Sequence, residues 1–177
     1  MRMRNFAAGF LTALALVGVA GLMARGELIK QRRALWPAAP MRSLAGIRKI
    51  HVLVLPFPEQ LRPTGLTAET TRQDWREKLE GAGFEVVTRP ARDVPVLHLK
   101  IAAQSNEAGS IAASVSLLLH QDVQIKRLEQ DLVVPTYPRV LLALETDETL
   151  RKSIKDALDY LVRSFIENCS RAETMKE

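Results

Sequence analysis

The chain has 177 residues, of which 47% are hydrophobic, and its formal net charge is +5 at pH 7. This length suits one domain with a real core and leaves little room for two. The single cysteine excludes an intrachain disulfide. The charge is uneven, because residues 2–4 carry +2, residues 25–49 carry +6 and residues 51–177 are net −3. A mildly acidic domain argues against nucleic-acid binding, which needs a basic patch on the domain itself.

Residues 6–24, FAAGFLTALALVGVAGLMA, contain no charged side chain and predict a transmembrane helix. At about 1.5 Å of rise per residue such a helix is about 28 Å long, close to the ~30 Å hydrocarbon thickness of a bilayer. Arg2 and Arg4 precede the run and Arg25 follows it, so the cost of burying charge in lipid sets its limits. We expect a retained anchor in the inner membrane of a bacterium, crossing once, with the soluble domain in the periplasm.

The alternative is a cleaved secretory signal, with MRMR as its basic start and small residues at Gly18 and Ala20 before the cleavage site. The apolar run continues past that site through Leu22 and Met23, which favours retention. No cysteine directly follows the run, so a lipid-modified amino terminus is not expected.

Small residues in the predicted anchor indicate packing against other membrane helices. Gly9, Ala13 and Gly21 recur at multiples of four residues and would let another helix approach closely. The alternative explanation is that glycine and alanine are common in anchors and signal sequences. We expect these three residues to contact membrane proteins of a larger complex.

The segment from residue 25 to residue 48 is predicted to be a basic juxtamembrane linker. An indole and several cationic side chains suit the membrane interface, where they would contact anionic lipid headgroups, each basic residue contributing about 1 kcal/mol. The residues concerned are Arg25, Lys30, Arg32, Arg33 and Trp36. The alternative is that these charges merely flank an anchor. Pro37 and Pro40 stop any helix and stiffen the spacer.

The first half of the soluble part predicts a strand, a helix and a second strand. Residues 49–57 are apolar on both faces, which is typical of a strand in the middle of a covered sheet. A helix is expected to follow Thr67 as its N-cap and to end at Gly81 and Gly83, and residues 84–88 predict the next strand. A phosphate-binding loop is not expected, since these glycines follow a helix and precede a strand.

The second half predicts a hairpin, further extended segments and a long helix. Residues 95–103 and 111–125 pair with Leu97 opposite Leu119 and Leu99 opposite Leu117, which leaves one face of the hairpin wet. Residues 131–136 and 140–144 are extended candidates whose prolines suit an edge or a bulge. Apolar residues repeat at helical spacing from Leu150 to Cys169, and we interpret the cysteine as a small buried hydrophobe.

These elements predict an α+β fold, with one N-terminal transmembrane helix and a two-layer domain. In that domain a mainly antiparallel sheet of about five strands is covered by two helices. The expected organisation is an anchor at 1–24, the basic linker at 25–48, the globular domain at 49–170 and a flexible tail at 171–177.

Groups for catalysis or metal binding are few. In the predicted hairpin register His98 and His120 lie diagonally on the wet face, but they lack an obvious third ligand. No acid pair, Ser/His/Asp group or Cys/His pair stands out from the scattered polar residues. We therefore predict no catalytic residue, no metal, no cofactor and no small-molecule substrate, and we do not expect an enzyme.

Several sequence segments resemble a group of uncharacterised bacterial envelope proteins with a signal-like start. The segments are VLVLPF, GLTAETTRQDWREKL, GAGFEVV, LHLKI, SVSLLLHQDVQI and LRKSIKDALDYLVRSFI. More loosely, the chain is similar to the amino-terminal domain of the Tol–Pal translocation protein, from which it departs by lacking a helix between Val87 and Pro95. The resemblance implies a docking module, and no binding residue follows from it.

The functional expectation is a non-catalytic, single-pass accessory or structural subunit of a larger membrane protein complex. Transport, secretion, respiratory and photosynthetic assemblies all fit this description. A free periplasmic module that binds a lipid or a peptide by its sheet edge is one alternative. A metal-dependent enzyme that uses His98 and His120 is the other.

Overall fold

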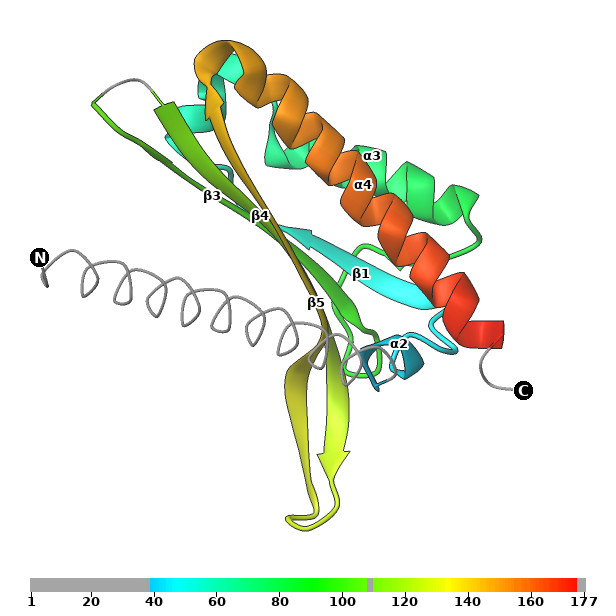
Figure 1. Cartoon of the computed structure of the whole chain (residues 1–177). Coiled ribbons are helices and arrows are strands. Elements are labelled where there is room, and N and C mark those ends of the chain that lie inside the picture. Colours follow the sequence, from blue (N-terminus) through cyan, green and yellow to red (C-terminus); the bar gives the residue numbers. More distant parts are fainter. Residues whose placement is uncertain (1–38, 108–109, 175–177) are drawn as a thin grey trace, which may run out of the picture. The chain divides into compact units, whose positions relative to one another are not determined.

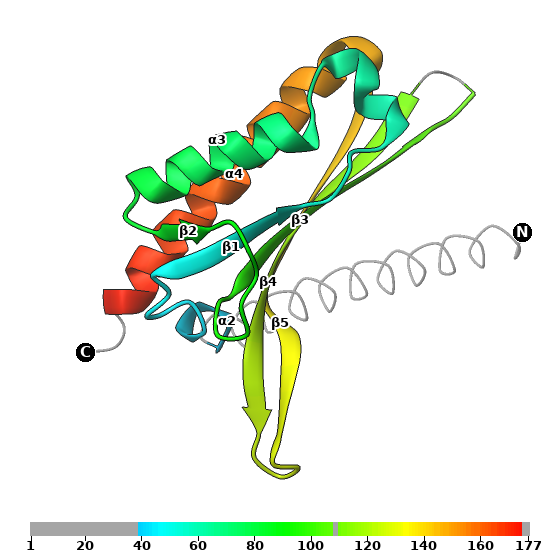
Figure 2. The same cartoon turned by 180° about the vertical axis from the view of Figure 1, so that it is seen from behind.

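A computed structural model describes residues 39–107 and 110–174 of the chain. These residues form two layers, a five-stranded sheet and two long helices that lie on the same face of it (Figures 1 and 2). The helices are α3 (Ala68–Gly81) and α4 (Asp147–Thr174). Within the described ranges no helix has both the length and the apolar character needed to cross a membrane, and the anchor predicted at residues 6–24 lies outside them.

The sheet is mixed, with its strands in the order β2-β1-β3-β4-β5. The strands are β1 (Lys49–Val54), β2 (Glu85–Val87), β3 (Val96–Ser105), β4 (Ser110–Ile125) and β5 (Gln130–Thr146). β1 runs parallel to both of its neighbours, β2 and β3, whereas β3/β4 and β4/β5 are antiparallel. The predicted α+β class with five strands and two helices is confirmed. The predicted mainly antiparallel sheet is corrected to a mixed one, because α3 connects β1 to β2 and such a crossover makes parallel neighbours.

The hairpin of β3 and β4 has the register that the sequence predicts. Leu97 lies opposite Leu119 and Leu99 lies opposite Leu117. All four leucines are completely buried, because the register keeps the apolar residues of both strands on the face below the helices. At the turn, the backbone N–H of Asn106 donates to the carbonyl of Ser110 at 3.0 Å.

β5 is one long edge strand that includes both extended segments expected from the sequence. Its register against β4 shifts between Leu119 and His120, so that Thr136 is the extra residue of a β-bulge. Pro135 and Pro138 lie beside this bulge, on a strand whose only neighbour is β4. The expected association of these prolines with an edge or a bulge is confirmed.

Among the described residues the core lies on one face of the sheet. In β1, Ile50, Val52 and Val54 are buried below the helices, but Leu53 on the opposite face is 38% exposed. The expected place of this strand in the middle of the sheet is confirmed, since β1 lies between β2 and β3, but the described residues cover only one face of it. Its alternate residues face away from both helices, which pack on the same side (Figure 2).

α4 contributes most of the buried apolar residues of the helical layer. Phe165 is completely buried, with ring centroids 6.0 Å from both Phe84 and Tyr137. Cys169 is also buried on this stripe, and burial raises the pKa of its thiol to about 12. The cysteine is thus a packed hydrophobe with no thiolate at neutral pH, as the sequence predicts.

The ends of α3 follow the predicted capping pattern. The hydroxyl of Thr67 accepts a hydrogen bond from the backbone N–H of Thr70. The hydroxyl of Thr70 in turn accepts one from the backbone N–H of Thr67. Gly83, after the helix, has a φ of +88°, a backbone conformation that would be strained for a residue with a side chain. Lys78 binds Asp74 at 2.6 Å and Asp159 of α4 at 2.5 Å, and the second of these pairs joins the two helices.

The packed unit extends beyond the boundaries expected from the sequence. Short helices lie at α2 (Ala39–Arg42) and η1 (Glu59–Thr64). Leu44 and Ile47, within the expected linker, belong to the core, and so does Ala172, within the expected tail. The backbone N–H of Gly46 donates to Glu173 Oε1 at 2.6 Å, which ties the end of α4 to the start of the domain.

Removing the buried aromatic ring of α4 tests this packing. We expect Phe165→Ala to lower the free energy of unfolding by about 3–5 kcal/mol, because it leaves a cavity between helix and sheet. Tyr160→Ala is the matched control, since Tyr160 lies on the same helix and is 54% exposed. Denaturant titration of the full chain in detergent measures both changes, and equal effects of the two substitutions would contradict the one-sided core.

Candidate functional site

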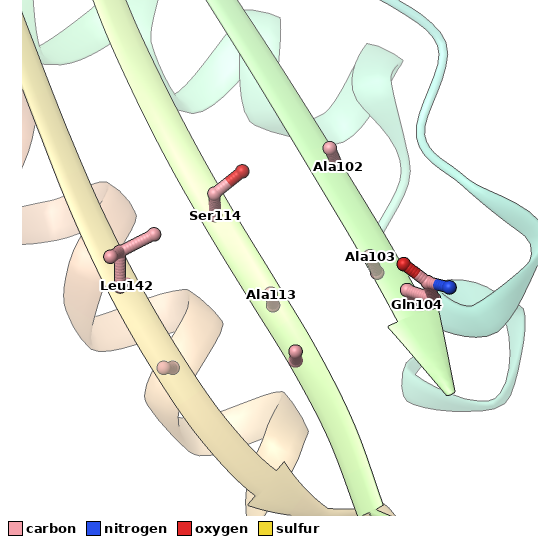
Figure 3. Close-up of a pocket in the computed structure, with 8 residues that line it drawn as sticks. Ala102, Ala103, Gln104, Ala113, Ser114 and Leu142 are labelled. Atoms are coloured by element: carbon pink, nitrogen blue, oxygen red, sulfur yellow. The ribbon is translucent and has the colours of Figure 1, made fainter. Parts of the chain in front are cut away.

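The face of the sheet that α3 and α4 leave open is the candidate functional site. Side chains of three adjacent strands form a row on it, since Ala102 pairs with Ser114 and Ser114 pairs with Leu142. Figure 3 shows these three side chains projecting from β3, β4 and β5 in turn. Alanine at 102 and 112 and serine at 114 leave a shallow depression beside the larger Leu142. We call this surface, from Ala102 across to β5, the open face.

The most apolar part of the open face lies on the edge strand. Val140, Leu142 and Leu144 are 56%, 81% and 74% exposed, and alternate positions of β5 place all three on the same side. We call these three residues the β5 row. Exposed leucines on a strand with an unpaired edge promote association with other proteins. Soluble proteins usually prevent such association by placing charged side chains on their edge strands. The β5 row carries no such charge.

Local sequence explains why β5 exposes this row. Around it the other alternate positions are Tyr137, Arg139, Leu141, Ala143 and Glu145, so the strand has apolar residues on both faces. Tyr137 is completely buried below α4, which fixes which set of residues faces the helices. The remaining set has to face outward.

Beyond the bulge, the ends of β4 and β5 extend past the helical layer (Figures 1 and 2). This distal hairpin exposes further apolar residues, namely Val123, Leu128, Leu132 and Val133. It interleaves them with charged side chains such as Asp122 and Asp131, which the β5 row lacks. The distal hairpin is therefore the less apolar of the two exposed regions.

A hydrogen-bonded cluster holds the beginning of the β5 row in place. The hydroxyl of Tyr137 accepts a hydrogen bond from Asn168 Nδ2 at 2.7 Å and one from Arg139 Nε at 3.1 Å. The guanidinium carbon of Arg139 also lies 4.6 Å from the centre of the Tyr137 ring, a cation–π arrangement. At the other end of the row, Glu145 accepts hydrogen bonds at 2.6 Å from Thr149 and from Ser153. These bonds lower the pKa of Glu145, the Ser153 bond most.

The two histidines predicted on the wet face lie together there. The ring centroids of His98 and His120 are 5.6 Å apart, on β3 and β4. His98 Nε2 is buried and has no hydrogen-bond partner among the described residues. Burial lowers the pKa of His98, and the nearby charges of His120 and Lys100 lower it further. Within the described part of the chain no three His, Cys, Asp or Glu side chains group as metal ligands would.

The structure does not describe the site residues named from the sequence. The helix-packing residues Gly9, Ala13 and Gly21 fall outside the described residues, and so does the membrane-interface set: Arg25, Lys30, Arg32, Arg33 and Trp36. Sequence reasoning missed the β5 row. A pattern of apolar residues at both alternating sets of positions, directly after Pro138, was the available sign of it.

Comparison with known proteins leaves the family open. No protein-family model matches the chain, and no curated protein matches it either. Among solved structures the chain is similar to a minor lipoprotein from Acinetobacter baumannii, with 14% identity and a TM-score of 0.37. The likeness covers 69% of this chain and 92% of that one. The likeness to the Tol–Pal translocation protein stays a prediction.

The lowered pKa of His98 makes stability depend on pH. The pKa of His98 is lower in the folded chain than its ordinary value. Below about pH 6.5, His98 therefore binds a proton more readily in the unfolded chain than in the folded chain. The stability that neutral His98 provides is therefore present above about pH 6.5 and is lost as the pH falls through the lowered folded-state pKa. We expect the thermal midpoint to fall between pH 7.5 and pH 5, and to fall less in His98→Gln. An identical pH dependence in the two proteins would contradict this account.

Proposed function

We propose that this protein is a non-catalytic, single-pass, membrane-anchored accessory or structural subunit of a larger membrane protein complex. The observation that carries the proposal is the β5 row, whose three apolar side chains are more than half exposed on an edge strand. Its extramembrane domain would dock through the open face, and its N-terminal helix would dock within the membrane. Transport, secretion, respiratory and photosynthetic assemblies remain the candidates.

The energetics of exposed leucines favour docking. Withdrawing one such side chain fully from water contributes about 1.5–3 kcal/mol, so burying the β5 row would supply a substantial part of a protein interface. A protein partner fits better than a small ligand, since the surface is broad and the edge of β5 offers backbone groups to another strand. Ala102, Ala112 and Ser114 leave room beside the row for side chains of that partner.

The setting of the complex follows from the amino-terminal sequence. The apolar run at residues 6–24 would hold the chain in the inner membrane, with the domain in the periplasm. Gly9, Ala13 and Gly21 would pack on helices of partner subunits. The basic residues Arg25, Lys30, Arg32 and Arg33, together with Trp36, would contact anionic lipid headgroups.

The membrane half of the proposal is tested by enlarging the small residues of the anchor. We expect Gly9→Leu combined with Gly21→Leu to release the protein from its complex in mild detergent, because leucine keeps the helix apolar but blocks close approach. Leu11→Ile combined with Leu22→Ile is the control, since on a helix both positions lie away from the face of Gly9, Ala13 and Gly21 and the changes preserve hydrophobicity. Unchanged co-purification of the first variant would reject this mode of packing.

The extramembrane half is tested on the β5 row. We expect Leu142→Glu combined with Leu144→Glu to reduce co-purification of the partner subunits by at least about tenfold, which corresponds to about 1.4 kcal/mol. A carboxylate buried without a partner in the interface costs more than that. Both residues are over 70% exposed, so the fold should tolerate the change, which circular dichroism of the purified chain checks.

Leu128→Glu combined with Val133→Glu is the matched control for this second experiment. These residues are 49% and 67% exposed and lie on the distal hairpin, outside the β5 row. Quantitative mass spectrometry of material purified from native membranes measures all three proteins. Equal partner recovery from wild type and from the β5-row variant would overturn the docking role of the open face.

A further inference from the structure

The free edge of β5 carries a pattern that is complementary to itself. From Arg139 to Glu145 the strand reads Arg-Val-Leu-Leu-Ala-Leu-Glu, a run of seven residues without proline between Pro138 and Thr146. Its two ends bear opposite charges, and its middle residue is Leu142. In an antiparallel pair of identical strands, residues equally far from the centre lie opposite each other. A strand with opposite charges at equal distances from its centre can therefore pair with its own copy.

We propose that a second copy of this chain docks on the edge of β5, antiparallel, with Leu142 opposite the partner's Leu142. This inference rests on the proposed docking role of the open face and names one partner of its edge. The pairing places Arg139 opposite the partner's Glu145, and Glu145 opposite the partner's Arg139. It joins the two five-stranded sheets into one continuous sheet with a two-fold axis at Leu142.

The same register matches the apolar residues. Val140 lies opposite the partner's Leu144, so the two β5 rows adjoin and form one apolar strip of doubled width on the open face. Residues directly opposite in antiparallel strands share a face, which is the basis of this match. The three side chains of the row are among the more exposed large hydrophobic residues of the described chain. The pairing shields their flanks from water.

Neighbouring registers lose this complementarity. With the axis at Leu141, Leu144 would lie opposite the partner's Pro138 and Arg139 opposite the partner's Ala143. With the axis at Val140, Pro138 would lie opposite the partner's Leu142 and Arg139 opposite the partner's Leu141. Only the axis at Leu142 brings the opposite charges together and keeps proline out of the paired run.

Both charged side chains are fixed by contacts within their own chain. Arg139 is anchored by its Nε and its ring contact to Tyr137, and its guanidinium makes no ion pair with any residue in the described ranges. Each carboxylate oxygen of Glu145 accepts one hydrogen bond from a hydroxyl of α4, which orients the group and leaves further acceptor capacity. Cross-strand ion pairs of this kind set register and partner choice.

Disulfide trapping of the full chain in native membranes tests the register. We expect Leu142→Cys to form a disulfide-linked dimer on mild oxidation, because directly opposite residues of antiparallel strands have Cα atoms about 4.5–5.5 Å apart, within disulfide range. Val133→Cys is the matched control, since it is an exposed position of the same strand outside the pairing, and it should not link. The native Cys169 is buried and does not interfere.

Charge reversal supplies an independent measurement that does not need a new cysteine. Arg139→Glu and Glu145→Arg should each weaken the dimer on the order of tenfold, as measured by light scattering in detergent, since each places like charges opposite each other twice. The double variant should recover the dimer. A monomeric wild type, or a double variant weaker than both singles, would overturn the pairing.

The outcomes separate this inference from the proposed function. If Leu142→Cys links to a different protein, or does not link at all while partner subunits still co-purify, the self-pairing is wrong and the docking role stands. If the β5-row glutamate variant still recovers its partner subunits while Leu142→Cys forms the dimer, the pairing stands and the proposed docking role of the open face falls.

Discussion

A sheet has two faces, and the long helices of this domain cover only one of them. Where the helices cover the sheet, alternate residues of β1, β3, β4 and β5 therefore face either the core or the open surface. Tyr137 of β5 lies in this core together with Trp75 of α3 and Phe165 of α4, and these large side chains pack the helices against the sheet. Within the described residues no second layer covers the opposite face, and its side-chain chemistry therefore decides what the molecule can contact there.

That chemistry changes across the open face. Most side chains that β3 and β4 contribute there are small or polar, including Ser114, Ser116 and the histidine pair, which water tolerates. β5 contributes Val140, Leu142 and Leu144, which water does not solvate well. The apolar part of this surface thus coincides with the strand that also has an unpaired edge. A docking partner can cover these side chains and can also add a strand to the edge. The proposed function uses the exposed side chains, and the proposed pairing uses the unpaired edge.

Local patterns predicted most of the domain. The alternation in β3 and β4 was sufficient for the exact register of Leu97 with Leu119, and helical spacing was sufficient for the buried stripe on α4. What could not be predicted was the relation between distant segments. The parallel neighbours of β1 depend on long-range pairing, and a strand apolar on both faces looks the same whether its second face is covered by its own domain or by another protein. Leu53 and Leu142 were therefore indistinguishable from core residues in the sequence, although one is 38% and the other 81% exposed.

The central claim is that the open face and edge of β5 are free in the isolated chain and covered in the assembled state. Hydrogen–deuterium exchange of the full chain, compared between native membranes and dilute detergent, measures this directly at residues 139–145. The account predicts that the backbone amides of this segment that point away from β4 exchange at least about tenfold more slowly in native membranes. The exchange rates of β1 and β3 should not change. Equal exchange of residues 139–145 in the two states would contradict it.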